Sequence, residues 1–176
     1  MQYFLATTNG TGAYYSYSGL GSLYYNQNAA GSAAALLYGP IGAADGGTSS
    51  EYFGTVYQDG NGLFSTNLTS VGLACSESDT ECVVNIVYFS PPNTTIVADW
   101  HNHPFAGGVG QFGDPDDPDQ DGDIWGPNNY PGYVSTLLGG GSGGWGVVLI
   151  GIAPAGQTSP ICLLVGTHMN GLSSCP

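Results

Sequence analysis

The sequence predicts one domain of the mixed α/β (α+β) class. Its 176 residues suit a single domain, because domains mostly run from about 100 to 200 residues. One segment has the composition of a helix, whereas several short runs rich in β-branched and aromatic residues indicate strands. Between these runs lies a long stretch of Gly, Pro, Asp and Asn, over residues 104–144, which predicts a long acidic loop.

The first part of the chain predicts an arm followed by the only helix. Residues 1–27 are rich in Tyr and Gly and show no helical period, so they indicate short strands and turns or an extended arm. The domain itself is expected over residues 28–176. A helix is predicted over residues 26–39, with Asn28 as its N-cap and Gly39-Pro40 as its end, and a loop follows over residues 42–50.

The remaining runs predict strands. Residues 51–67 form a hairpin pattern around Asp59-Gly60-Asn61-Gly62, because turn residues separate two β-rich runs. A polar loop over residues 70–82 follows. Further strands are expected in four places: residues 83–89, residues 94–103, residues 133–138 inside the acidic stretch, and a last hairpin over residues 145–153 and 160–167.

The charge balance excludes several classes of function. The chain contains no Lys or Arg and carries a formal charge of −13, so it cannot neutralise the phosphates of a nucleic acid. The same lack excludes a phosphate-binding lysine, a Schiff-base lysine and an arginine finger. The longest apolar run, residues 145–153, is too short for membrane insertion. Because carboxylates in such excess repel one another, bound cations are a physical expectation.

The four cysteines form two pairs that are close in sequence. Cys75 with Cys82 and Cys162 with Cys175 are the disulfides that proximity favours, although four cysteines allow three pairings. Disulfides persist in oxidising compartments, so the protein is expected to be extracellular or at the cell surface.

A His-x-His pair closes the strand predicted over residues 94–103. Residues two apart on a strand share a face, so the side chains of His101 and His103 can converge on one metal ion. Asp99 continues the same face and is a candidate to orient a histidine. The alternative interpretation is a pair of surface histidines beside a turn.

An acidic run follows at residues 114–123. Asp117, Asp119, Asp121 and Gly122 match the start of a calcium loop, and Asp123 stands where such loops donate a backbone carbonyl. Asn128 replaces the Glu that ends an EF-hand loop, so a true EF-hand is not expected. The run is therefore either a calcium-stiffened loop or a solvated acidic loop. Its six carboxylates are Asp114, Asp116, Asp117, Asp119, Asp121 and Asp123.

Taken in order, these pieces resemble the JAB/MPN family of zinc metalloproteases. The resemblance rests on the run of Ala and Leu before "SSEYFGTVYQ", on "ADWHNHP", and on an Asp before "PGYVST", and it covers residues 28–153. The chain looks most similar to a bacterial domain of unknown function attached to Rhs and other polymorphic toxins. The resemblance implies a mostly antiparallel central sheet with few helices.

The resemblance also implies roles for individual residues. Glu51 would be the general base, and His101 and His103 would be zinc ligands. The third ligand would be Asp114 by strict spacing, or Asp116 or Asp123 if the loop is longer. Strict spacing puts Gln111 at the position of the family's Ser, which helps to stabilise the oxyanion.

Two functions follow as expectations. The first is a secreted zinc-dependent hydrolase that acts on a peptide or isopeptide bond of a peptide or protein substrate. The second keeps the fold but not the catalysis. It is a calcium-stabilised structural subunit of an extracellular fibre or surface assembly, which self-associates into a polymer by strand addition from the N-terminal arm.

Overall fold

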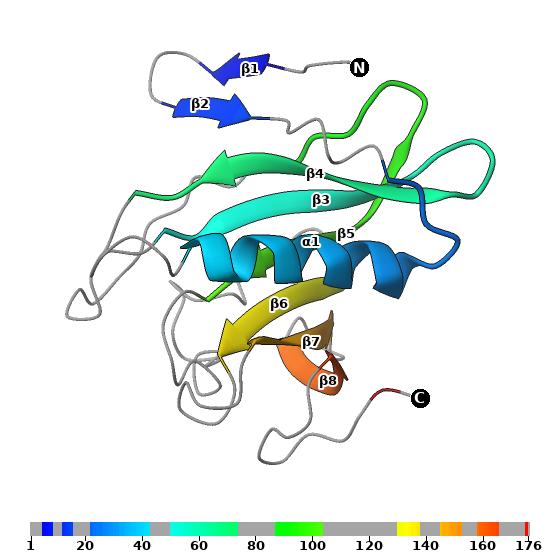
Figure 1. Cartoon of the computed structure of the whole chain (residues 1–176). Helices are drawn as coiled ribbons and strands as arrows, with labels where there is room; N and C mark the ends of the chain where they lie inside the picture. The colour runs from blue at the N-terminus through cyan, green and yellow to red at the C-terminus, as the bar shows by residue number, and fades with distance from the viewer. Residues whose placement is uncertain are drawn as a thin grey trace.

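The computed structural model describes residues 5–8, 12–15, 22–42, 50–73, 87–103, 130–137, 145–152, 158–165 and 175. Figure 1 shows one helix lying against one face of a sheet. In chain order the elements are β1 (Leu5–Thr8), β2 (Gly12–Tyr15), α1 (Gln27–Gly42), β3 (Tyr52–Gln58), β4 (Phe64–Val71), β5 (Thr95–Asn102), β6 (Gly132–Leu137), β7 (Trp145–Ile152) and β8 (Thr158–Val165).

The central sheet has six strands in the order β4-β3-β5-β6-β7-β8. Every neighbouring pair is antiparallel except β5 and β6, which are parallel. The predicted mixed class with a mostly antiparallel sheet is therefore confirmed. Because β5 and β6 are parallel, their carboxyl ends meet at the same edge of the sheet, which is where parallel strands usually place a binding site.

The helix begins and ends at residues other than those predicted. Asn26, not Asn28, is the N-cap, because its Oδ1 accepts the N–H groups of Asn28 at 2.7 Å and Ala29 at 3.3 Å. The predicted end at Gly39-Pro40 is also wrong, since α1 continues to Gly42. A Cβ on Gly39 would lie 2.6 Å from the ring of Trp145, so this last turn packs closely on β7. Tertiary contact therefore holds Pro40 inside the helix, although Pro lacks the N–H for one helical bond.

The predicted hairpin over residues 51–67 is formed by β3 and β4, and β4 runs on to Val71. Asp59 closes its turn, because one carboxylate oxygen accepts the N–H groups of Asn61 at 2.8 Å and Leu63 at 2.9 Å. These bonds, with that from Leu63 the strongest, hold the pKa of Asp59 below its ordinary value. Gly62 adopts a φ of 82°, which a residue with a side chain would disfavour.

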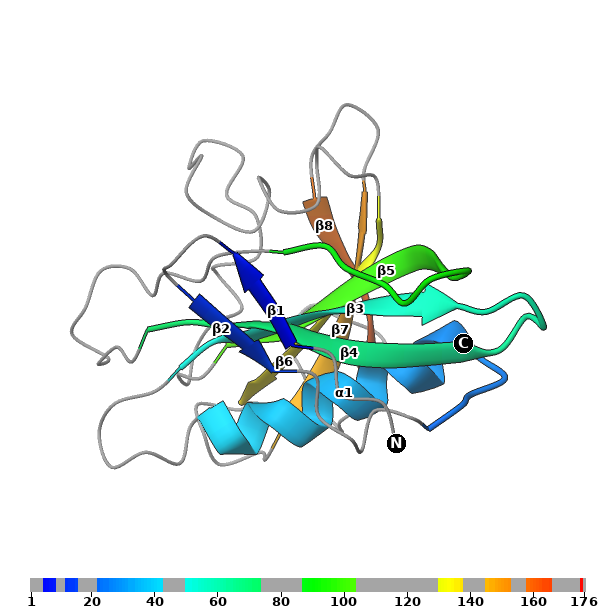
Figure 2. The same ribbon diagram turned by 90° about the horizontal axis from the view of Figure 1, so that it is seen from above.

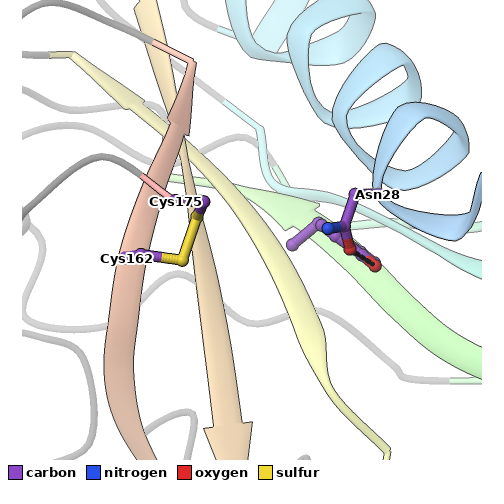
Figure 3. Close-up of a disulfide and its surroundings, with 4 residues drawn as sticks. Asn28, Cys162 and Cys175 are labelled. Atoms are coloured by element: carbon purple, nitrogen blue, oxygen red, sulfur yellow. Dashed lines mark hydrogen bonds between the residues drawn. A yellow bond between two sulfur atoms is a disulfide. The ribbon is translucent and has the colours of Figure 1, made fainter.

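The core lies between α1 and the sheet. Trp100 of β5 stacks on Tyr38 of α1 with ring centroids 4.9 Å apart, and Tyr38 stacks in turn on Tyr52. Small residues allow this close approach, because a Cβ on Gly54 would collide with the Trp100 indole. Tyr133 of β6 is fully buried against the same helix, and its hydroxyl donates to Asn28 Oδ1 at 2.8 Å. Asn28, taken as a cap from the sequence, thus joins helix to sheet (Figure 3).

The opposite face of the sheet is covered by the segment that precedes β5. Residues 83–89 were expected to form a strand, but residues 87–89 do not, and residues 83–86 lie outside the described part. Instead, the Tyr88 ring meets the edge of Phe53, and the Phe89 carbonyl accepts bonds from Thr55 and Asn67. Figure 2 shows α1 on one side of the sheet and this green segment on the other.

The C-terminal strands follow their prediction. The strand expected within the acidic stretch is β6, and the final hairpin is β7 with β8. Pro160 lies in β8, an edge strand, where its missing N–H removes no bond to a further strand. A disulfide of S–S length 2.00 Å joins Cys162 of β8 to Cys175 (Figure 3). Cys75 and Cys82 lie outside the described residues.

At the N-terminus, β1 and β2 form a separate two-stranded antiparallel sheet. This is the alternative of short strands and turns that the sequence left open for the arm. Figure 1 shows this small sheet next to β4. Among the helices of the described ranges, none has the length and apolar character needed to cross a membrane.

Candidate metal site

The candidate site lies on the face of β5 that points away from α1. Trp100 points toward α1, so its alternate neighbours Asp99 and His101 point to the opposite face. His103 follows the end of β5, but its N–H donates to the Ser135 carbonyl at 2.8 Å. The pairing with β6 thus continues to this residue, and both histidines share one face at the carboxyl ends of β5 and β6.

The two imidazoles converge. Their Nε2 atoms lie 3.0 Å apart, the ring centroids are 5.0 Å apart, and the rings are inclined by 43°. His101 is 2% exposed and His103 is 6% exposed. Two nitrogens bound to one tetrahedral zinc ion at about 2.0 to 2.1 Å would lie roughly 3.3 Å apart. The observed 3.0 Å is the length of a hydrogen bond between the two rings, and it is also close to the separation of two nitrogens around one zinc ion.

Glu51 approaches this pair through the register of the sheet. In the antiparallel pairing of β3 with β5, Phe53 lies opposite His101. Two residues outward on each chain, Glu51 comes opposite His103 and points to the same face. The N–H of Gly72 donates to the Glu51 carbonyl at 2.7 Å, so the chain is still paired with the end of β4 at this point. Glu51 is partly exposed, whereas the histidines are buried.

Asn102 fixes the segment that carries Glu51. Its Oδ1 accepts the N–H of Tyr52 at 2.6 Å, and its Nδ2 donates to the Ser50 carbonyl at 3.3 Å. One amide side chain, itself fully buried, thus holds the residues on both sides of Glu51 against the end of β5. These two hydrogen bonds tie the segment that contains Glu51 to the end of β5, although it is far from the histidines in sequence.

Asp99, the candidate to orient a histidine, is fully buried, and its Oδ2 accepts a hydrogen bond from the Tyr88 hydroxyl at 2.9 Å. A buried carboxylate normally requires a compensating positive charge. Since the chain has no Lys or Arg, only an imidazolium, the amino terminus or a bound cation can supply it. Asp99 lies on the same face of β5 as His101.

The remaining predicted ligands cannot be placed. Asp114, Asp116, Asp117, Asp119, Asp121 and Asp123 all lie outside the described residues, as does Gln111. Within the described ranges, no group of three or more His, Cys, Asp or Glu side chains is arranged to hold a metal ion. Of the predicted site residues, the structure brings His101 and His103 together, and the register of β3 with β5 puts Glu51 on the neighbouring chain segment.

Thr136 is a buried polar residue of this face that the sequence pattern did not indicate. In the parallel pairing of β5 with β6, His101 lies beside Val134 and Asn102 beside Ser135. The next residues, His103 and Thr136, therefore share the face on neighbouring strands. No local pattern could have identified Thr136, because a crossover connection separates β5 from β6 and leaves their register open.

We define the site row as the line of residues that crosses three strands at this edge. It consists of Glu51, His103 and Thr136, with Glu51 and Thr136 on opposite sides of His103. Glycines stand at both ends, since Gly72 pairs with Glu51 and Gly146 with Thr136. Among the described residues, the positions that flank the row on β4 and β7 are therefore glycines.

Comparisons of this chain with models of known protein families, with curated proteins and with solved structures found no match.

Proposed function

We propose that this protein is a zinc-dependent hydrolase of the JAB/MPN type that cleaves peptide or isopeptide bonds outside the cell or at its surface. One observation supports the proposal: two buried imidazoles converge at the carboxyl ends of β5 and β6, and the register of β3 with β5 puts Glu51, which precedes β3, next to His103 in the sheet. A base, two nitrogen ligands and a binding edge thus come together from segments about 50 residues apart in sequence.

The metal ligands would be His101 and His103, through their Nε2 atoms, with one carboxylate from Asp114, Asp116 or Asp123. When bound, zinc polarises a carbonyl group and lowers the pKa of a bound water. The burial of both histidines favours such a site, because a low-dielectric environment strengthens electrostatic interactions. Asp99 contributes negative charge on the same face, which favours a bound cation over two neutral imidazoles.

Glu51 acts as the general base. Its carboxylate takes a proton from the water that attacks the amide carbonyl, and it gives this proton to the departing amine. Its partial exposure supports this role, because water can reach the carboxylate.

The acidic run also supports a second cation. Asp117, Asp119 and Asp121, with Asp123, keep the spacing of a calcium loop, and calcium would relieve the mutual repulsion of these carboxylates. In this proposal calcium binds to and stabilises the loop, while one carboxylate of the same run is the third zinc ligand.

A second candidate function is a catalytically inactive, calcium-stabilised subunit of an extracellular fibre or surface assembly. The separate β1–β2 sheet favours it, because a short hairpin outside the main sheet is suited to pairing with a neighbouring chain. β4, which pairs within the main sheet with β3 alone, is the edge nearest to that hairpin. Self-association into a polymer would then replace hydrolysis as the function.

The deciding experiment combines metal analysis with one substitution. Wild type and Glu51→Gln are stripped of metal, reloaded with zinc and with calcium separately, and their bound metals are measured by elemental analysis. Each form is then incubated with a panel of internally quenched peptides and a peptide carrying a lysine-linked isopeptide bond.

The hydrolase predicts about one zinc per chain in both proteins and cleavage that Glu51→Gln lowers by roughly 10²- to 10⁴-fold. If both proteins bind zinc equally and only Glu51→Gln loses cleavage, Glu51 acts as the base and is not a zinc ligand. Calcium as the only bound metal, together with polymers that dissociate on chelation, would instead establish the structural subunit.

A further inference from the structure

Thr136 has a buried hydroxyl for which the described residues provide no hydrogen-bond partner. Thr136 is 0% exposed, and it lies on the face of the sheet to which His101 of β5 also points. Leaving a buried hydroxyl without a partner is costly, so most buried polar groups in proteins are bonded. Because this hydroxyl lies next to a candidate site, a bound ligand could supply its missing hydrogen-bond partner.

Several buried hydroxyls in the same sheet have partners. Thr55 Oγ1 lies within hydrogen-bond distance of Asn67 Oδ1 and the Phe89 carbonyl, Ser65 donates to the Ser22 carbonyl, and Thr69 donates to the Phe53 carbonyl. Ser70 and Ser135, like Thr136, have none among the described residues. Of these three residues without a partner, Thr136 is the one that follows the register of β5 with β6 to a position beside His103, on the face that carries the histidines.

The reaction requires a hydrogen-bond donor beside the substrate carbonyl. Hydrolysis of an amide develops negative charge on the carbonyl oxygen, and a positioned hydrogen-bond donor stabilises that charge. In the JAB/MPN motif a Ser helps in this role, but strict spacing puts Gln111 there. No Lys or Arg exists in the chain to take over the role.

We propose that Thr136 is a catalytic residue whose hydroxyl donates a hydrogen bond to the substrate carbonyl oxygen as the amide is cleaved. The inference rests on the proposed hydrolase. Water oxygen bonds to the carbonyl carbon, the carbonyl π electrons move to the oxygen, and Thr136 stabilises that oxygen. Glu51 takes the proton of the water. The C–N bond then breaks, the carbonyl re-forms, and the proton goes to the amine.

The spacing of the site row allows Glu51 to act as the base and Thr136 as the hydrogen-bond donor on the same amide. Neighbouring strands lie about 4.8 Å apart, so the backbones that carry Glu51 and Thr136 are roughly 10 Å apart, with His103 between them. One amide group fits in this interval. Water attacks from the side of Glu51, and the carbonyl oxygen points toward Thr136.

The test uses Thr136→Val, which removes the hydroxyl at nearly constant volume, and Thr136→Ser, which restores it. Ser135→Ala is the matched control, because Ser135 is the adjacent residue, is equally buried and has no described hydrogen-bond partner for its Oγ, but belongs to the helix-covered face. For each protein, bound zinc, kcat, KM, the thermal unfolding midpoint and the affinity for a phosphinate peptide are measured. The phosphinate imitates the tetrahedral oxyanion.

We expect Thr136→Val to bind zinc as wild type does and to lose roughly 10²- to 10³-fold in kcat, with KM little changed. Phosphinate affinity falls with kcat, because both report binding of the transition state. Thr136→Ser restores most of both, and Ser135→Ala changes neither. The unfolding midpoint of Thr136→Val stays equal to wild type or rises, since a hydroxyl without a partner is removed.

Two outcomes overturn the inference. One is Thr136→Val with wild-type kcat and phosphinate affinity, while Glu51→Gln still abolishes cleavage; the hydrolase then stands without Thr136. The other is a lowered midpoint with a loss of activity that Thr136→Ser does not restore, which would make the hydroxyl structural. If zinc-loaded wild type cleaves no faster than Glu51→Gln, the hydrolase itself fails, and the role of Thr136 fails with it.

Discussion

The two faces of the central sheet are equally buried but differ in chemistry. Toward α1, β5 and β6 present Trp100 and Tyr133, which stack and pack against helix residues. Away from α1, the same strands present Asp99, His101 and Thr136, which are just as inaccessible to solvent. Alternation along a strand decides which face each side chain joins. The histidine face carries the candidate binding residues, while the helix face is mainly aromatic and aliphatic but also holds the buried Asn102 and Ser135.

This difference has an energetic consequence. Apolar burial on the helix face lowers the free energy of the folded state, whereas burial of carboxylates, imidazoles and hydroxyls raises it unless they find partners. Buried carboxylates, imidazoles and hydroxyls are common where they bind a ligand or take part in a reaction. The comparison predicts that substitutions on the helix face reduce stability, and that those on the histidine face reduce binding.

The largest effect on stability is expected at Trp100. Trp100→Ala removes a fully buried indole, its stacking on Tyr38 and its hydrogen bond to the Asn67 carbonyl. The free energy of unfolding should fall by about 3 to 5 kcal/mol, as measured by urea denaturation. Thr136→Val, equally buried on the other face, is the control. A comparable loss in that control would remove the distinction between the faces.

The next effect is the stabilisation by zinc. At free zinc about 100 times its dissociation constant, the unfolding free energy of wild type should rise by about 2.7 kcal/mol. His103→Gln should lose this gain, since it removes one of the two Nε2 ligands, yet keep the unfolding free energy of the metal-free protein. Calorimetry with and without zinc measures both. A gain that persists in His103→Gln would assign the ion to the acidic run.

A smaller effect is expected at the Tyr133 hydroxyl, the polar group at the edge of the apolar face. It donates to Asn28 and accepts from Gln27 at 3.2 Å. Tyr133→Phe leaves both amides without this partner, so the free energy of unfolding should fall by about 1 to 2 kcal/mol.

The same hydroxyl predicts a loss of stability in alkali. Burial raises the pKa of Tyr133 from 10.0 to about 12, so folding favours the protonated phenol. Its contribution is complete below pH 10 and is lost as the pH rises toward 12. Tyr133→Phe should therefore lose less stability than wild type between these values in denaturation experiments. Parallel curves for the two proteins would contradict the assignment.

The smallest effect is expected at the start of α1. Asn26→Ala removes the acceptor for the N–H groups of Asn28 and Ala29, which should cost about 1 kcal/mol. Asn26→Asp keeps an acceptor and should preserve stability. Thermal unfolding followed by circular dichroism measures both. If Asn26→Ala unfolds as wild type does, Asn26 contributes nothing as a cap.

Errors in the prediction of the elements have a common cause. The hairpin around Asp59 was predictable because its turn is closed by bonds within five residues. Asn28 and Pro40 were misread because Tyr133 and Trp145, from distant strands, decide what happens at the two ends of α1. The strand expected at residues 83–89 failed at residues 87–89, where the chain packs across a sheet face.

By itself, the sequence determined the class of fold, the His-x-His pair and the exclusion of every lysine- or arginine-dependent function. These follow from local alternation, turn chemistry and composition, which need no distant partner. Only the tertiary structure decided that Glu51 and Thr136 lie on opposite sides of His103. That arrangement depends on the order and register of β3, β5 and β6. Strand pairing joins residues that are far apart in sequence, so the local sequence pattern does not indicate which residues become neighbours.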